Sequence, residues 1–338
     1  MAKKSSNGLI LIALLLIIVG CSNSSTEIKA PTTPFLGGDG KLEVSFLEGN
    51  PPGEITDGNT FPFQAIVKLK NTGEYDIPKD ELKVSLIGFL PGQFKSSIES
   101  EKFSDSDLTG KKLDSGLSGK KRDGEGNIIN SIETFLTFPE NTKNFKFSGS
   151  EQGNNIFIFR ADVCYKYTTK VVSEICILQN QIDKSVKGVC DPYAQKQVFN
   201  SASPVKITKF TQNVAGKDKV QFSFDIAHEG NGKLFTPSSP IDCPKEPDSA
   251  RNKEDFIGIK VDTGLSDGYN LNCAGLSPTS SSGTAAGTLK LTDKQRTVTC
   301  TLDLPKSRTD FRKPINIEIG FDYEESADKE ILVKHLTD

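Results

Sequence analysis

Two stretches decide the fold, ADVCYKYTTKVVSEICI (161–177) and IEIGFDYEESADKEILV (317–333). They align without a gap at an offset of 156 residues, because residue 161 matches residue 317. Apolar residues match at alternate positions: Val163, Tyr165 and Tyr167 with Ile319, Phe321 and Tyr323. This alternation predicts strands with one buried face. We interpret each stretch as a long strand, a short polar turn and a return strand, which form a β-hairpin.

Earlier segments repeat in the same order. Residues 63–73, an alternating run that closes with Asn-Thr-Gly, resemble residues 220–230, which close with His-Glu-Gly. The opening segment 42–46 likewise resembles 205–210. An ordered internal repeat predicts two homologous domains.

The repeat predicts domain boundaries. We place one domain at 41–198 and the other at 199–338, with a junction at 201–204. Strand signals run through both, and no apolar stripe at helical spacing interrupts them. Each repeat has room for about seven strands, the number in an immunoglobulin-like sandwich. We therefore expect an all-β protein with two tandem immunoglobulin-like β-sandwich domains.

The N-terminus predicts export. Lys3 and Lys4 precede eleven apolar residues, Leu9–Val19. A membrane span needs about twenty apolar residues, so residues 1–20 are better interpreted as a signal peptide. Whether Cys21 is a cleavage and attachment point is a separate question, and an ordinary signal peptide with an incidental Cys21 and an uncleaved membrane anchor are the alternatives. Residues 21–40 are rich in Ser, Thr, Pro and Gly and are expected to form a flexible linker.

The residues Ile18-Val19-Gly20-Cys21 resemble the lipobox of prokaryotic lipoproteins. This resemblance implies cleavage before Cys21, lipidation of its sulfur and attachment to the outer face of the cell membrane. The body resembles tandem immunoglobulin-like domains of bacterial and archaeal surface proteins, including the adhesion-related CARDB type. Asn71-Thr72-Gly73 matches the strand ending of that family, whereas His228-Glu229-Gly230 departs from it.

Cysteine usage also indicates an oxidising compartment. Without Cys21, six cysteines remain, an even number that predicts three disulfides. They are Cys164, Cys176, Cys190, Cys243, Cys273 and Cys300.

Strand phase suggests how these cysteines pair. Cys273 and Cys300 fall on inward-facing positions, which predicts a bridge between sheets. The expected hairpin places Cys164 opposite Cys176 and leaves Cys190 for Cys243. A Cys176–Cys190 bridge remains open as a competitor. A zinc site is disfavoured because the cysteines form no C-x2-C pair.

The sequence contains few signs of catalysis or metal binding. The sequence contains no phosphate-binding loop, nucleophile elbow or H-E-x-x-H motif. His228 is expected to make a strand-end hydrogen bond and His335 to be partly exposed. Residues 123–127 alternate oxygen ligands as calcium loops do, but they lack the later Gly and Glu of an EF-hand, so a solvated turn is preferred.

The net charge of the chain limits the kinds of molecule that it is expected to bind. The net charge is −3, and removal of Lys3 and Lys4 with the signal peptide lowers it to −5. An acidic body argues against nucleic acid. We expect no cofactor, no catalysis, a membrane attachment at Cys21 and a protein partner at the cell surface, in adhesion or envelope structure. The alternatives are a ligand-binding subunit of a transport or secretion assembly and, less favoured, an extracellular hydrolase.

Overall fold

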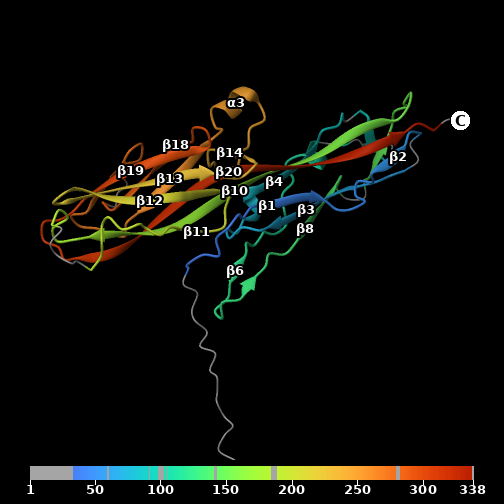
Figure 1. Ribbon diagram of the computed structural model, residues 1–338. Helices are drawn as coiled ribbons and strands as arrows, with labels where there is room; N and C mark the ends of the chain where they lie inside the picture. The colour runs from blue at the N-terminus through green and yellow to red at the C-terminus, as the bar shows by residue number, and fades with distance from the viewer. Residues whose placement is uncertain are drawn as a thin grey trace, which may run out of the picture.

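The computed structural model describes residues 33–336 except 59–60, 91, 98–102, 104, 141–142, 184–188 and 279–281. Within these residues the chain is nearly all β, arranged in several sheets (Figure 1). The helical pieces described are η1 (Lys79–Glu81), α2 (Asp105–Leu108) and α3 (Pro247–Arg251). The expectation of an all-β protein is therefore confirmed.

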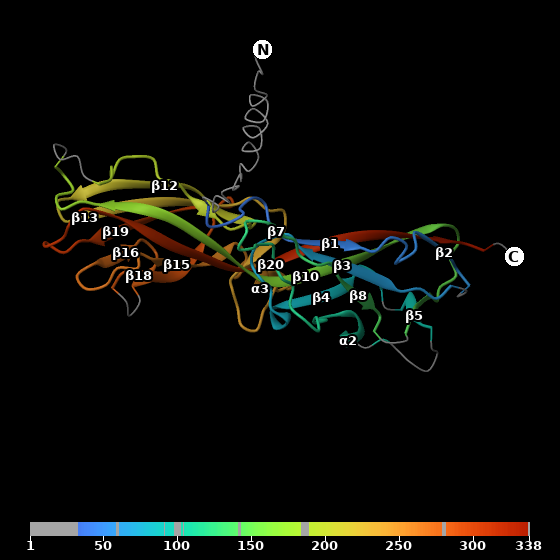
Figure 2. The same ribbon diagram turned by 90° about the horizontal axis from the view of Figure 1, so that it is seen from below.

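Two long strands organise the molecule, β10 (Asn155–Ile177) and β20 (Phe311–Lys334). They pair antiparallel along the whole of β10, from Asn155 opposite Val333 to Ile177 opposite Phe311. Figures 1 and 2 show this ribbon running along the long axis of an elongated molecule. Each long strand therefore serves both halves of the protein.

The ribbon is the centre of a nine-stranded sheet. On the N-terminal half its other strands are β2 (Glu54–Thr56) and β4 (Leu82–Ile87). On the C-terminal half they are β11 (Phe199–Asn200), β14 (Lys233–Phe235), β15 (Phe256–Asp262), β17 (Ser277–Pro278) and β18 (Thr284–Lys290). The expected domains 41–198 and 199–338 thus share one sheet.

A second layer lies over each half. The N-terminal layer is a three-stranded sheet of β1 (Leu42–Phe46), β3 (Ala65–Asn71) and β8 (Thr134–Phe138). The C-terminal layer is a four-stranded sheet of β12 (Val205–Gly216), β13 (Lys219–His228), β19 (Gln295–Asp303) and β16 (Asn270–Cys273). The order β1-β3-β8 matches β12-β13-β19. The sequence repeat predicts the first two of these matches, and the match of β8 with β19 comes from the structure.

Two small two-stranded sheets complete the fold. One pairs β5 (Phe94–Ser96) with β9 (Phe145–Phe147) over an aromatic core. In that core the rings of Phe89 and Phe159 stack at 4.3 Å between centroids. The other is a projecting hairpin of β6 (Lys121–Arg122) and β7 (Ile128–Ile129).

The expected hairpins at 161–177 and 317–333 are wrong. Each stretch is one continuous strand, and its partner is the other copy of the repeat. The supposed turn residues, such as Thr168-Thr169-Lys170, contain no Gly, Pro or Asn that would reverse the chain. Their alternation of buried and partly buried side chains instead continues without a break.

The repeat and the register together define a two-fold relationship. An offset of 156 makes Lys166 equivalent to Asp322, and these two residues are also opposite each other across the ribbon. Strands β4 and β15 obey the same relationship, since Ala161 pairs with Leu86 and its equivalent Ile317 pairs with Val261. A pseudo-two-fold axis therefore passes between Lys166 and Asp322.

The end of the expected linker is held against the body. The backbone N–H groups of Leu36 and Gly37 each donate to the Glu74 carboxylate at 2.9 Å. Gly40 is buried where a Cβ would come within 2.5 Å of the Gly73 Cα and 2.7 Å of Ala202. Leu36, Gly37 and Gly40 are therefore held against the body near the two-fold axis, because Glu74 in turn donates its backbone N–H to the Tyr167 hydroxyl, one residue from Lys166. Residues 1–32, with the signal peptide and Cys21, lie outside the described residues.

Candidate functional site at the central seam

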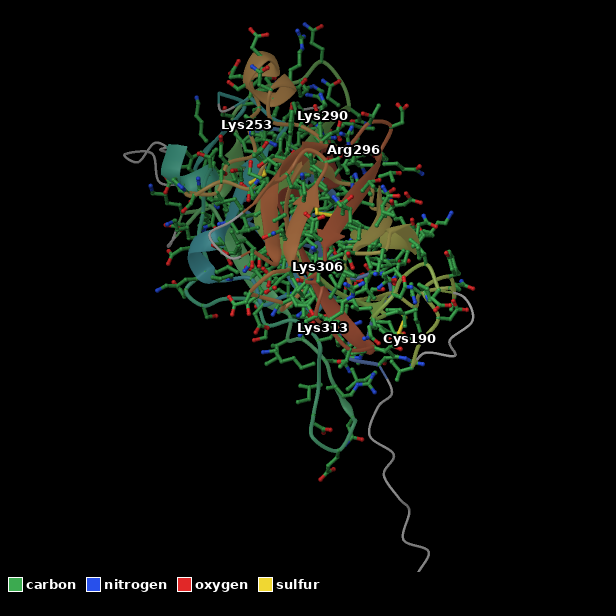
Figure 3. All side chains as sticks on the ribbon, turned by 90° about the vertical axis from the view of Figure 1, so that its left-hand side faces the viewer. Cys190, Lys253, Lys290, Arg296, Lys306 and Lys313 are labelled. Atoms are coloured by element: carbon green, nitrogen blue, oxygen red, sulfur yellow. A yellow bond between two sulfur atoms is a disulfide. The ribbon has the colours of Figure 1, made fainter. Side chains whose placement is uncertain are left out.

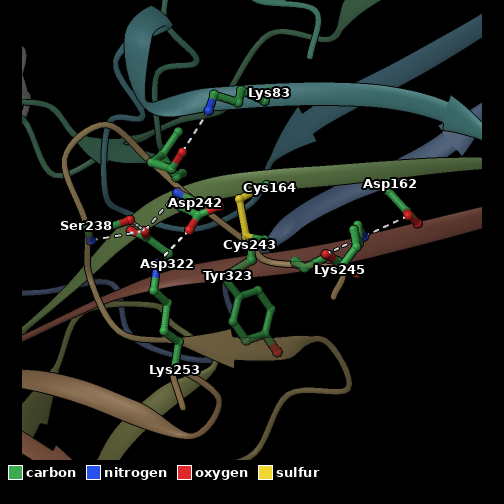
Figure 4. The surroundings of a disulfide bond; sticks show 12 residues. Lys83, Asp162, Cys164, Ser238, Asp242, Cys243, Lys245, Lys253, Asp322 and Tyr323 are labelled. Carbon is green, nitrogen blue, oxygen red and sulfur yellow. Dashed lines mark hydrogen bonds and ion pairs between the residues drawn. A yellow bond between two sulfur atoms is a disulfide. The ribbon is translucent and has the colours of Figure 1, made fainter. Parts of the chain in front are cut away.

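The seam between the two halves is closed by a disulfide. Cys164, in β10, is bonded to Cys243, in the segment between β14 and α3, with 5.9 Å between their Cα atoms (Figure 4). This segment crosses from the C-terminal half onto the outer face of the ribbon. It also reaches β4, where Lys83 Nζ donates to the Ile241 carbonyl at 2.8 Å. The seam is therefore covalently and electrostatically clamped.

The expected Cys164–Cys176 bridge is wrong, and so is Cys190–Cys243. Cys164 and Cys176 lie on one continuous strand, so twelve residue steps of about 3.3 Å hold them roughly 40 Å apart. Cys176 is bonded to Cys190, the competitor that strand phase had left open.

The expected Cys273–Cys300 bridge is present, but it does not connect two sheets. The two cysteines face each other directly in neighbouring strands β16 and β19, with 3.9 Å between Cα atoms. Strand phase put both side chains on the inward face, and neighbours within one sheet satisfy that condition as well as strands in facing sheets do. The three bridges together indicate an oxidising, extracytoplasmic environment.

A fully buried carboxyl group lies beside the seam disulfide. Asp322 Oδ2 accepts hydrogen bonds from the backbone N–H of Ser238 at 3.0 Å, from that of Asp242 at 3.3 Å and from the Ser238 hydroxyl (Figure 4). Its Oδ1 is buried with no hydrogen-bond partner among the described residues. Burial raises the pKa of Asp322, although the hydrogen bonds oppose this effect.

Lys245 links the crossing segment to both long strands. Its Nζ lies 2.8 Å from Asp162 Oδ2 in β10 and 2.5 Å from Glu324 Oε2 in β20. Burial lowers the pKa of Lys245, but the hydrogen bonds to the two carboxylates outweigh it, so the pKa is raised. The ammonium group therefore stays charged and joins three segments that are far apart in sequence.

The cavity at the seam is small and partly open to solvent. It measures about 170 Å³ and is lined by Lys83, Ser85, Asp162, Lys245 and Glu324 around the disulfide. Sites for small molecules commonly measure about 300–1,000 Å³. The cavity at the seam is therefore too small to hold a sugar or a peptide.

Two larger hollows are open to solvent. One of about 820 Å³ lies over the ends of β13 and β19, near His228 and Arg296. The other, of about 730 Å³, lies along residues 193–213 beside β12. Both lie on the C-terminal half, away from the seam disulfide.

His228 has the structural role expected of it. Its Nε2 lies 2.9 Å from Tyr323 Oη at the end of β13. Burial lowers the pKa of the imidazole, and Lys294 adds to this effect. The ring is therefore neutral at pH 7 and serves as a hydrogen-bonding group.

The second histidine holds the C-terminal segment. His335 Nδ1 lies 2.7 Å from Asp57 Oδ2, and its side chain is 35% exposed. Asp57 also accepts the backbone N–H groups of Leu336 and Glu151. These hydrogen bonds, Leu336 first, lower the pKa of Asp57 to about 2.

Another carboxyl group faces the tyrosines of the seam. The Glu325 side chain is 11% exposed, and its Oε1 lies 3.8 Å from Lys41 Nζ. Burial raises the pKa of Glu325, and the Lys41 charge opposes this only in part. Burial also raises the pKa values of the neighbouring Tyr165 and Tyr323. The arrangement of Glu325, Lys41 and the two tyrosines indicates packing and charge pairing at the seam.

The oxygen-rich loop 123–127 forms a turn closed by its own residues. Asp123 Oδ1 accepts the backbone N–H groups of Glu125 at 2.9 Å and Asn127 at 2.7 Å. Asp123 Oδ2 accepts the Asn127 side-chain amide at 3.0 Å. Among the described residues, no group of three or more His, Cys, Asp or Glu side chains is placed to hold a metal ion.

Sequence reasoning missed a repeated glycine–tyrosine contact. A Cβ on Gly73 would lie 1.8 Å from Tyr167 Oη, and one on Gly230 would lie 2.2 Å from Tyr323 Oη. Tyr167 and Tyr323 are equivalent in the repeat, and each glycine ends a strand-closing triplet. The alternating strands and the triplets were visible in the sequence, but their contact across sheets was not.

The comparisons with known proteins leave the family open. No protein-family model matches the chain, and no curated protein does. Among solved structures, a secreted serine protease, VesC from Vibrio cholerae, is similar with a TM-score of 0.18 and 8% identity over 82% of this chain. The chain spans half of that protease.

A second similar structure is described as the complete structure of manganese lipoxygenase of Gaeumannomyces graminis with a partial structure of zonadhesin of Komagataella pastoris. Its TM-score is 0.16 at 10% identity, with 86% of this chain and 95% of that chain covered. Neither similarity carries an argument about function. Of the helices described, none has the length and hydropathy to cross a membrane.

Proposed function

We propose that the protein is an exported lipoprotein, attached to the membrane through lipid on Cys21, that acts without catalysis as a rigid surface scaffold. Its work is protein–protein contact, in adhesion or in envelope structure. In this proposal the two layered halves are tandem immunoglobulin-like sandwiches that share a ribbon.

The clamped seam is the observation that carries the proposal. Cys164–Cys243 and the Lys245 pairs with Asp162 and Glu324 join the crossing segment to β10 and β20. Their charges face one another around a cavity of about 170 Å³, so they serve to hold two halves in one orientation. A fixed orientation suits a protein that presents surfaces at a distance from one another.

Ligand capture is the second candidate function. The hollow of about 820 Å³ beside His228 and Arg296 has the volume of a small-molecule site, which favours it. Its openness to solvent favours a contact surface for a larger partner instead, because small ligands are commonly buried over most of their surface. An extracellular hydrolase has no comparable supporting observation.

Mass spectrometry of the mature N-terminal peptide tests the anchor. The expected result is a peptide that begins at Cys21 and carries a diacylglyceryl thioether, with the protein in the membrane fraction. Cys21→Ser is expected to release the protein from that fraction, whereas Ser22→Ala leaves it there. An N-terminal peptide with an unmodified Cys21 would overturn the proposal.

Chemical cross-linking on intact cells tests the proposed mode of action. A defined cross-linked protein partner is expected for the wild type. A small molecule that co-purifies in the hollow near His228, without any cross-linked protein, would instead support ligand capture.

A further inference from the structure

The β6–β7 hairpin projects from the body with aliphatic side chains in solvent. Ile128, Ile129 and Ile132 are 57%, 54% and 84% exposed. The strands pair Lys121 with Ile129 and Arg122 with Ile128, so each of these two isoleucines has a basic neighbour on its own face of the hairpin. The hairpin pairs with no other described strand. Three exposed isoleucines within five residues of one small projecting element suit contact with an apolar surface.

The base of the hairpin and the start of the described chain are fixed by one short segment, residues 73–76. Lys120 N donates to the Gly73 carbonyl at 2.7 Å, and Gly119 N donates to Asp76 Oδ1 at 2.8 Å. Between them lies Glu74, which holds Leu36 and Gly37. The described chain therefore begins beside the base of the hairpin. Figures 1 and 3 both show the hairpin projecting on the side where the described chain begins.

Chain length limits how far the body can stand from the anchor. Twelve residue steps separate Cys21 from Thr33, and a fully extended chain spans at most about 3.6 Å per residue. A lipid on Cys21 thus holds the bilayer surface within about 43 Å of Thr33. The hairpin is the element that projects from the body at this place.

We propose that the β6–β7 hairpin docks on the lipid bilayer, with the isoleucines at the acyl boundary and Lys121 and Arg122 at the lipid phosphates. This inference rests on the proposed attachment at Cys21. Aliphatic side chains flanked by basic ones suit the membrane interface, because the long basic side chains bury their stems and keep their charges at the headgroups. The anchor and the hairpin then give two membrane contacts beside the pseudo-two-fold axis, so the middle of the long body faces the membrane.

A single tryptophan reporter tests the contact, because the chain has no Trp. Ile129→Trp places the reporter on the hairpin. Ile156→Trp, at a position 62% exposed near the far end of the ribbon, is the matched control. Because both side chains are exposed, both variants are expected to retain the fold and the three disulfides.

The whole chain from Cys21 onward is coupled through the Cys21 thiol to maleimide lipids in vesicles of phosphatidylcholine and phosphatidylglycerol. This coupling supplies the anchor even if natural lipidation fails, so the two proposals can fail separately. The Ile129→Trp emission is expected to shift to shorter wavelength on vesicles and to be quenched by lipids brominated in their acyl chains. The Ile156→Trp emission is expected to stay as in buffer.

Three results would overturn the inference. The first is an unshifted Ile129→Trp emission on coupled vesicles, and the second is an equal shift in both variants. The third is a shift that brominated lipids do not quench and that disappears when the protein is diluted on the vesicle, since that pattern indicates a second copy of the chain as the occupant.

Discussion

Lys166 and Asp322 lie opposite each other across β10 and β20, and the repeat makes the same two residues equivalent. Two residues can be equivalent in the repeat and also lie opposite each other in the ribbon only if a two-fold axis relates the two copies. The copies therefore exchange the second halves of their last strands, much as two subunits of a strand-swapped dimer would, within one chain.

Gly73→Ala is predicted to destabilise the protein by about 1–3 kcal/mol, the usual cost of overpacking. The added Cβ would lie 1.8 Å from Tyr167 Oη and would break the hydrogen bond that this hydroxyl donates to the Ala202 carbonyl. Denaturant unfolding measures the change. Gly53→Ala is the control, because a Cβ there has no neighbour within 4 Å. Equal midpoints for the two variants would contradict the prediction.

Removal of the seam disulfide, Cys164–Cys243, is predicted to lower the free energy of unfolding by more than removal of Cys176–Cys190. The bonded residues are 79 apart in the first case and 14 in the second, and loop entropy gives about 4.5 and 3 kcal/mol. Paired Cys→Ser variants of each bridge, compared by denaturant unfolding, measure the difference. A larger loss of stability from removal of the Cys176–Cys190 bridge would contradict the prediction.

Asp57→Asn is predicted to flatten the acid dependence of stability. The folded pKa of Asp57 is about 2, below the ordinary 3.8, so its stabilisation is complete above about pH 4. It is lost as the pH falls from about 4 to about 2, because the unfolded state takes up the proton first. Thermal unfolding across this range measures the slope. A variant with the wild-type slope would contradict the prediction.

Glu325→Gln is predicted to have the opposite dependence on pH. Burial raises the folded pKa of Glu325, so its ionisation destabilises the fold progressively as the pH rises above 4.5. The stability of the variant relative to the wild type should therefore rise with pH and then level off. Denaturant unfolding from pH 4 to 8 measures it. Glu330→Gln, exposed on the same strand, is expected to change stability by less than about 0.5 kcal/mol.

The sequence predicts the strands and the repeat well, because alternation at 63–69 and 220–226 is a local property. It does not reveal the partner of each strand. Residues 161–177 and 317–333 alternate in the same way whether each folds back on itself or pairs with the other copy. The hairpin interpretation then led directly to the wrong partner for Cys164.

The seam could not be predicted for a related reason. Cys243, Ser238 and Lys245 lie in a polar segment without periodicity, and only the three-dimensional path of that segment brings them to β10 and β20. The Cys273–Cys300 bridge was predictable because both residues lie in regular strands.

The shared ribbon also affects when each half of the protein can finish folding during synthesis. Residues 324–333 pair with residues 155–164 of β10 in the first half, and residues 332–334 also pair with β2, yet they are synthesised after the rest of the second repeat. A chain that emerges N-terminus first at about 5–20 residues per second must therefore keep its first half unfinished until β20 has been synthesised. A truncation before β20 would therefore remove the strand that pairs with β10 and β2 and would open the half that was made first.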